Sequence, residues 1–222
     1  MSTTPSDIPI SAADVKKPRD ETGAGMMDCK RALSESKGDV TAAKDLLRTW
    51  GLAGVEKRKA RTASDGLVVS YLHEVGGLPP KVGVLLELDT ETDFVAKTPE
   101  FQQLVKDLAM QVAASSPRYV SREEVPAVEL ETEREIYRKQ ALQAGKPEKV
   151  IERIVEGQVE RFYKDVCLLE QPFLKQPERT VKEIVQEAIV RFGVNVTVRR
   201  FARFGLGETA TKESPAGGAP GA

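Results

Sequence analysis

The chain has 222 residues, of which 40% are hydrophobic and 30% are charged, a balance typical of a well-solvated globular protein. Its formal net charge of −1 provides no basic field for non-specific nucleic-acid binding, so we expect a protein partner and no direct contact with nucleic acid. No apolar run approaches the roughly 18 residues of a membrane-spanning helix, and the first ten residues lack the basic and apolar parts of a secretory signal. We therefore expect a cytoplasmic protein with no membrane contact.

The N-terminal quarter is predicted to be helical. Residues 1–12, rich in Ser, Thr and Pro, are expected to form a flexible leader, and residues 13–52 a compact unit of three short helices. Pro18 interrupts the first helix, so that helix is expected to be shorter than its pattern or to begin at about Lys17. The segment Thr22-Gly23-Ala24-Gly25 lacks the GK[ST] ending of a phosphate loop and is predicted to be a turn between helices.

Residues 53–65 are expected to be a charged linker. They include Glu56-Lys57-Arg58-Lys59-Ala60-Arg61, with four cations in six residues. So short a run could touch a phosphate backbone, but a solvated linker or an extension of the preceding helix is the better interpretation.

The period of the apolar residues changes at Gly66, where alternation predicts strands. Residues 67–72 and 82–88 are expected to form a β-hairpin, with Gly76-Gly77-Leu78-Pro79-Pro80 as a long tip. A loop from Asp89 to Lys97 then leads to a helix, with Thr98 as N-cap and Pro99 in its first turn.

The second half of the chain alternates between helical and extended patterns. Residues 127–143 and 147–164 are predicted to be two charged helices in a helical hairpin, Thr180 and Glu183 to form a capping box, and residues 194–204 to be a strand. The core, residues 66–207, is thus expected to be α+β, with a roughly three-stranded antiparallel sheet packed with helices on one side. The tail, 208–222, is expected to be disordered.

Few residues suit enzyme chemistry. His73 is the only histidine, and Cys29 and Cys167 lie in no metal-binding spacing. The acids between Asp89 and Asp93 lack the glycine turn and closing glutamate of a calcium loop. We therefore expect no enzyme activity, no metal and no cofactor.

Two segments carry large apolar side chains at positions that the predicted elements do not clearly bury. Thr92-Asp93-Phe94-Val95 puts a large aromatic side chain in a polar loop, and periodicity alone favours a Phe94 that folds back into the core. Met26-Met27 begins a helix, and because both cannot face one small core, we expect one of them to be exposed.

These segments resemble the elongation factor Ts family. The matching motifs are Thr22-Gly23-Ala24-Gly25-Met26-Met27-Asp28-Cys29-Lys30-Arg31-Ala32-Leu33 and Glu91-Thr92-Asp93-Phe94-Val95-Ala96, supported by Gln171-Pro172-Phe173 and Asn195-Val196-Thr197-Val198-Arg199-Arg200-Phe201. The resemblance runs from about Ser11 to Gly207. The length is similar to the short form of the family, which has a single core subdomain and no coiled-coil insertion.

The resemblance implies a guanine-nucleotide exchange factor of translation elongation that binds GDP-bound elongation factor Tu. It implies a ubiquitin-associated-like domain for residues 13–52, whose Arg19, Met26, Met27 and Lys30 would contact the G domain of that partner. Thr92, Asp93, Phe94 and Val95 would enter the G domain and dislocate its Mg²⁺, which requires an exposed Phe94. Short-form relatives pair through the core sheet, so a homodimer is expected near residues 194–204.

The chain departs from the family pattern at three places. Pro18 replaces a helix-favouring apolar residue, Asp89-Thr90 replaces Asn-Cys, and Gln111 stands where many relatives have histidine. Two alternatives remain open at this level. One is a non-catalytic ubiquitin-associated-like binding or scaffold module that uses residues 13–52 alone. The other is an RNA-binding translation factor that uses residues 57–61.

Overall fold

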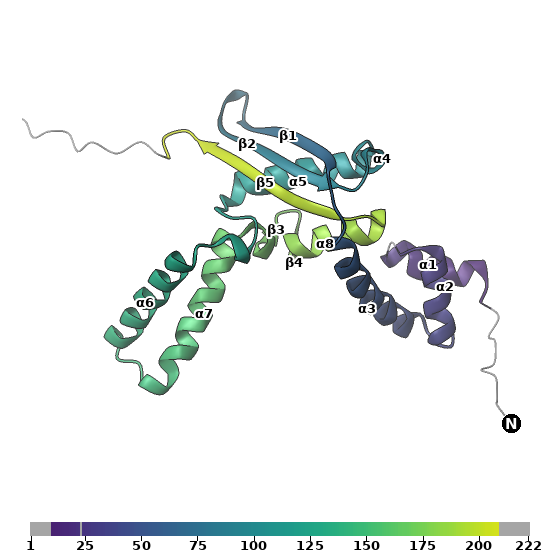
Figure 1. Ribbon diagram of the computed structural model, residues 1–222, viewed down its shortest axis with the longest axis horizontal. Coiled ribbons are helices and arrows are strands. Elements are labelled where there is room, and N and C mark those ends of the chain that lie inside the picture. The colour runs from purple at the N-terminus through teal and green to yellow at the C-terminus, as the bar shows by residue number, and fades with distance from the viewer. Residues whose placement is uncertain (1–9, 23, 209–222) are drawn as a thin grey trace, which may run out of the picture.

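The computed structural model describes residues 10–22 and 24–208 and has a helical bundle at one end, an α+β core in the middle and a helical hairpin at the other end (Figure 1). The predicted leader and tail lie largely outside the described residues. Within the described part of the chain, no helix is both long and apolar enough to cross a bilayer.

The N-terminal bundle consists of α1 (Ala12–Thr22), α2 (Met26–Glu35) and α3 (Val40–Lys59), which confirms the three predicted helices. Its small core includes Cys29, Leu33 and Leu47, all almost fully buried. Asp39 caps α3 by accepting hydrogen bonds from the backbone N–H groups of the second and third residues of that helix.

The expectation for Pro18 is wrong, because α1 continues through it to Thr22. A proline ring inside a helix removes one backbone donor. Here the ring is buried beside Val15, one helical turn earlier, so it contributes apolar surface to the bundle in place of that hydrogen bond.

Helix α3 extends across much of the segment expected to be a linker. It ends at Lys59, where its last turn is basic, and Val55 is buried in the main core. The same end of α3 packs against α8 (Val181–Phe192), and Arg58 donates a hydrogen bond to the carbonyl of Gly193 just beyond α8. One continuous helix therefore joins the bundle to the core.

The main sheet has three antiparallel strands in the order β1–β2–β5, formed by β1 (Asp65–Val75), β2 (Leu78–Thr90) and β5 (Val196–Gly205). The hairpin is confirmed, but its long tip is wrong. Gly76 and Gly77 both have positive φ and close a tight turn of two residues, so Pro79 and Pro80 belong to β2.

One face of the sheet is covered by helices and the other is bare. Helix α5 (Pro99–Ser115) packs across β1 and β2, and α8 packs against β5 (Figure 1). The N-cap of α5 is Thr98 and that of α8 is Thr180, which forms the predicted capping box with Glu183. The core between these layers contains fully buried Leu86, Leu88, Phe101, Leu108 and Ile189.

The predicted helical hairpin is confirmed as α6 (Ala127–Gln143) and α7 (Glu148–Val166). The two helices pack on each other over Ala141, Ile151, Val155 and Val159 and project from the core (Figure 1). The hairpin lies between α5 and the last strand in sequence, where the alternation of helical and extended patterns placed it.

A short two-stranded sheet, β3 (Pro172–Phe173) and β4 (Gln176–Thr180), was not predicted. It follows two single turns of 3₁₀ helix, η1 (Arg122–Glu124) and η2 (Leu168–Glu170), at the base of the hairpin. Buried Gln111 of α5 holds it, accepting a hydrogen bond from Leu174 N at 2.7 Å and donating one to Pro172 O at 3.1 Å. Gln111 therefore ties α5 to this small sheet.

Candidate partner-binding site

A single helical turn, α4 (Asp93–Ala96), presents the most exposed aromatic side chain of the described residues. The side chain of Phe94 is 80% exposed, whereas Ala96 is 4% exposed and Val95 packs against the main core. The interpretation that Phe94 folds back into the core is therefore wrong. The exposure implied by the family resemblance is confirmed.

The turn around Phe94 is held on both sides by local contacts. Thr92 precedes α4 in an extended conformation, and Thr98 donates its hydroxyl to the carbonyl of Val95 at 2.7 Å. Asp93 pairs with Lys97 at 2.5 Å, and this hydrogen bond raises the pKa of the Lys97 ammonium. Phe94 therefore projects from a fixed turn. We call residues Thr92–Val95 the Phe94 turn.

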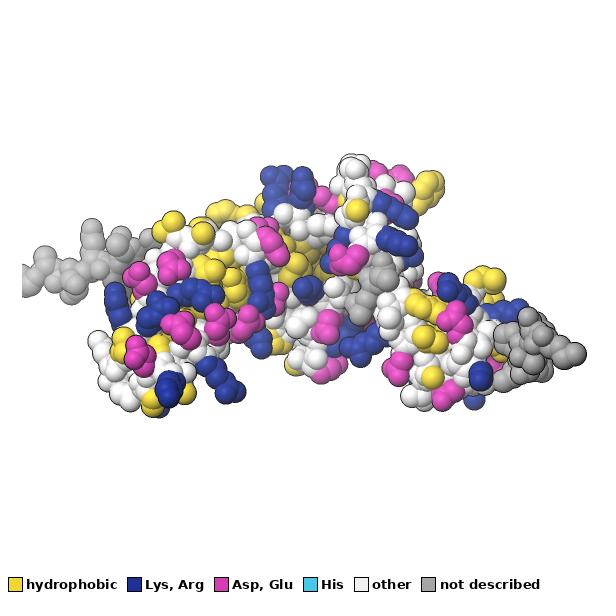
Figure 2. All heavy atoms as spheres, turned by 60° about the horizontal axis from the view of Figure 1, so that its bottom comes forward, with side chains coloured by type: hydrophobic (Ala, Val, Ile, Leu, Met, Phe, Trp, Pro, Cys, Tyr) yellow, Lys and Arg dark blue, Asp and Glu magenta, His cyan; other side chains and the backbone are white. Residues whose placement is uncertain are grey.

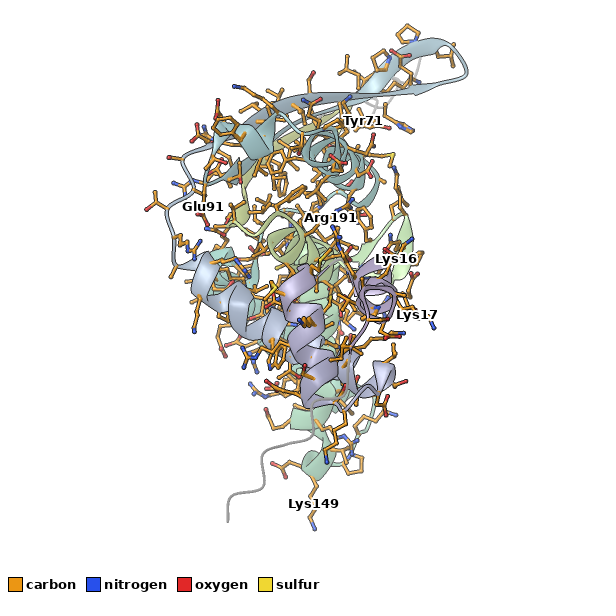
Figure 3. All side chains as sticks on the ribbon, turned by 90° about the vertical axis from the view of Figure 1, so that its right-hand side faces the viewer. Lys16, Lys17, Tyr71, Glu91, Lys149 and Arg191 are labelled. Atoms are coloured by element: carbon orange, nitrogen blue, oxygen red, sulfur yellow. The ribbon has the colours of Figure 1, made fainter. Side chains whose placement is uncertain are left out.

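Glu91 connects the Phe94 turn to distant parts of the chain, and Figure 3 labels it at the edge of the core. One carboxylate oxygen accepts a hydrogen bond from the backbone N–H of Asn195 at 2.5 Å, and the other lies 3.6 Å from the guanidinium of Arg61. The Asn195 amide in turn donates to the carbonyl of Arg61 at 2.8 Å. Sequence reasoning missed this cluster because its members lie up to 134 residues apart.

The first turn of α2 carries the second group of predicted residues. Met26 is 59% exposed and Met27 is 76% exposed, so neither faces the small core, whereas the sequence led us to expect one exposed side chain. The packing face of α2 is occupied instead by Cys29, Ala32 and Leu33, leaving Lys30 exposed with both methionines. Arg19 is exposed on α1. We call Arg19, Met26, Met27 and Lys30 the α2 surface.

Both surfaces lie at the same end of the molecule. In Figure 1, α4 is at the upper right and α1 and α2 are at the lower right, whereas the helical hairpin is at the opposite end. The exposed Phe on the core and the exposed Met side chains on the bundle therefore belong to elements at one end of the molecule.

Near the Phe94 turn, Asp89 lies partly buried on β2. Burial raises the pKa of this carboxyl and the neighbouring Glu87 raises it further, while Arg199, 3.9 Å away, opposes both effects. Asp89 faces the side of the sheet that carries Glu87 and Arg200, which pair with each other at 2.6 Å. Burial and the neighbouring Glu87 carboxylate on the same face of the sheet thus account for the raised pKa of Asp89.

No catalytic arrangement is found among the described residues. No group of three or more His, Cys, Asp or Glu side chains there could hold a metal ion. His73 contacts Tyr71 at 3.1 Å on an exposed strand end, and burial raises the pKa of the Cys167 thiol to about 11, so that thiol is not activated. A surface cavity of about 390 Å³ between α2, α3 and α8 has no histidine or cysteine in its lining.

The fold and site define an α+β protein whose candidate site consists of exposed apolar side chains rather than a catalytic cluster. A model of the family described as elongation factor TS matches residues 53–208. The chain is 55% identical over 205 residues to elongation factor Ts of Syntrophomonas wolfei, covering 92% of this chain and 94% of the relative. It is 51% identical over 203 residues to elongation factor Ts of Heliobacterium modesticaldum, covering 91% and 93%. It is 53% identical over 204 residues to elongation factor Ts of Geobacter sulfurreducens, covering 92% and 93%.

The chain therefore belongs to the elongation factor Ts family and is a translation elongation factor. The resemblance drawn from the sequence motifs is confirmed.

Proposed function

We propose that this chain is a guanine-nucleotide exchange factor that does no covalent chemistry. It binds elongation factor Tu in its GDP-bound state, displaces the Mg²⁺ ion and promotes the release of GDP, so that GTP can bind. It acts in the cytoplasm. The family membership supports the translational role, and the exposed Phe94 is the observation that carries the mechanism.

Phe94 acts as a wedge. A side chain that is 80% exposed gains apolar burial only when a partner receives it, and buried aromatic anchors dominate many protein interfaces. Because the turn on which it stands is already fixed by Thr98 and the Asp93–Lys97 pair, little ordering is lost when the ring is inserted. Entry of this ring into the G domain disturbs the Mg²⁺ ion and the phosphate-binding loop there.

The α2 surface supplies a second contact. Met26 and Met27 are flexible and polarizable and adapt to an apolar surface, while Arg19 and Lys30 add positive charge at its edge. This contact binds the G domain whether it is open or closed, so it contributes affinity. The Phe94 turn distinguishes the two states.

The exchange follows from linkage between two ligands. Phosphate contacts and Mg²⁺ hold GDP on the closed G domain, and the chain binds the open, Mg²⁺-poor form more tightly. The factor by which the chain weakens GDP binding equals the factor by which GDP weakens binding of the chain. A thousandfold weakening corresponds to about 4 kcal/mol of coupling. The cellular excess of GTP then sets the direction.

Release of a fluorescent GDP analogue from elongation factor Tu, followed by stopped flow, tests the proposal. We expect the wild-type chain to accelerate release, Phe94→Ala to lose most of the acceleration, and Met27→Ala to require more of the chain for the same maximal rate. Val128→Ala is the matched control, because Val128 is 79% exposed but lies on the helical hairpin. Failure of the wild type to accelerate release refutes the exchange function. Full activity of Phe94→Ala refutes only the wedge.

We further propose that two copies of the chain pair through the bare face of the sheet. Val68, Leu72, Leu85 and Phe204 are each at least half exposed there. The strand register brings Leu72 and Phe204 to either side of Gly83. An apolar sheet face of this kind is typical of an interaction surface. Sedimentation of the chain alone tests this: we expect a dimer for the wild type and a monomer for Phe204→Asp, whereas a wild-type monomer at high concentration refutes the pairing.

A further inference from the structure

The helical hairpin is covered only where it joins the core. At its base, Arg122 of η1 binds Glu160 of α7 through two hydrogen bonds of 2.8 and 2.9 Å and Glu170 through a third of 2.6 Å. Beyond this base, α6 and α7 contact each other, and charged side chains of both signs cover the hairpin at the left of Figure 2. The outward side of α7 is therefore open to a partner.

That outward side is basic. Ile151, Val155 and Val159 turn toward α6, and the opposite side of α7 carries residues spaced three or four apart, all exposed. We call them the α7 basic face: Lys149, Arg153, Gly157, Arg161 and Lys164. Figure 3 labels Lys149, which points away from the protein at the end of the hairpin.

The acids of α7 do not neutralise this face. Three of them are engaged elsewhere, since Glu152 pairs with Arg138, Glu156 with Arg134 and Glu160 with Arg122. Arg161 has only a loose contact with Asp165 at 3.9 Å, and its side chain is 76% exposed. Among the described residues, Lys149, Arg153 and Lys164 have no acidic group within 4 Å. Three of the four cations of the α7 basic face are therefore in no ion pair with the described part of the chain, and the fourth is only loosely held, so the face can present them to an acidic surface.

Gly157 lies at the centre of this face, and no contact within the described residues requires a glycine at this position. It stands in the middle of a helix of 19 residues, where glycine is disfavoured because it loses the most backbone freedom on folding. A Cβ atom there would meet nothing within 4 Å outside its own helix, so no packing partner excludes a side chain. The missing side chain instead lets another backbone approach α7 closely, flanked by Val150, which is 40% exposed.

We propose that the α7 basic face docks an acidic α-helix of a protein partner, which crosses α7 at Gly157. Its carboxylates pair with Arg153 and Arg161 on either side of the crossing, and its small or apolar side chains rest on Gly157 and Val150. A nucleic-acid backbone is the less suitable occupant, because phosphates are held by the cations alone and gain nothing from a glycine between them. This docking is independent of the exchange function, which uses the opposite end of the molecule.

Fluorescence anisotropy with two labelled probes and the full-length chain tests the proposal. The first probe is a synthetic peptide helix of 21 residues that carries glutamates on one side and alanine and leucine beside them. The second is a short RNA duplex. We expect the peptide to bind the wild type, and both Arg153→Glu and Gly157→Leu to weaken it by at least about tenfold. Lys139→Glu, on α6, is the control, and it should change peptide binding by less than about twofold.

The glycine variants separate shape from charge. Leucine favours a helix more than glycine does, so Gly157→Leu keeps the hairpin folded, which circular dichroism checks. Gly157→Ala adds only one methyl group and should weaken the peptide by less than about threefold. Three results would each overturn the proposal: peptide binding that Gly157→Leu leaves unchanged, an RNA duplex that binds while the peptide does not, and no binding of either probe.

Discussion

Replacing Glu91 with alanine removes the anchor of the Phe94 turn without touching the turn itself. The carboxylate is only 18% exposed and accepts the backbone N–H of Asn195, a residue that is 4% exposed. An unpaired buried donor costs about 1–3 kcal/mol, and the lost hydrogen bond is to a charged group. The Arg61 pair adds less than about 1 kcal/mol, because the Arg61 side chain is 55% exposed and 3.6 Å away.

The free energy of unfolding of Glu91→Ala is therefore expected to fall by about 2–3 kcal/mol. For a chain of 222 residues this lowers the melting temperature by roughly 5–10 °C. Urea unfolding followed by circular dichroism measures the first quantity and calorimetry the second. Glu91→Gln is the control, because its side-chain oxygen still accepts from Asn195 N, and its loss should be less than half as large.

GDP release extends the same test to function. A looser turn should reduce the exchange activity of Glu91→Ala although Glu91 is not placed against the partner, and Glu91→Gln should retain most of it. If the alanine variant is as stable as the wild type, the account of how Glu91 holds the turn is wrong.

Three further changes test other parts of the fold. Gln111→Leu should lower the free energy of unfolding, measured in urea, by about 2–3 kcal/mol, because it leaves Leu174 N and Pro172 O unpaired. A decrease below about 0.5 kcal/mol contradicts the structural role of Gln111. Arg122→Ala should release the base of the hairpin and speed amide hydrogen exchange in α7 relative to α5, whereas equal protection argues against that anchor. Gly157→Ala should stabilise the chain by about 0.5–1 kcal/mol, and a loss of stability would mean that Gly157 has a packing role that the structure lacks.

Sequence patterns predicted the elements whose causes are local. The N-caps Thr98 and Thr180 were predicted because a capping side chain and the backbone N–H that donates to it lie within three residues. The hairpin tip was wrong because Pro79-Pro80 is usually a breaker. These prolines are tolerated in β2 because β5 pairs with that strand only from Val82 onward, so they have a strand neighbour on one side alone.

The candidate site was less accessible to pattern analysis. Periodicity put Phe94 in the core, and only the resemblance to a known family indicated an exposed ring. The Glu91–Asn195 hydrogen bond joins residues 104 apart, which no local pattern could indicate. The outward side of α7 could not be identified as open to a partner either. The sequence of a helix does not show which of its charged side chains form ion pairs with neighbouring elements.

Displacement of Mg²⁺ is the central claim, and the rate of GDP release with and without the metal tests it most directly. Stopped-flow release from elongation factor Tu is measured with the chain present and absent, once with excess Mg²⁺ and once after chelation. If the Phe94 turn acts by dislocating the ion, chelation should speed release without the chain and reduce the factor by which the chain accelerates it. An acceleration factor that is the same in both conditions would contradict the account.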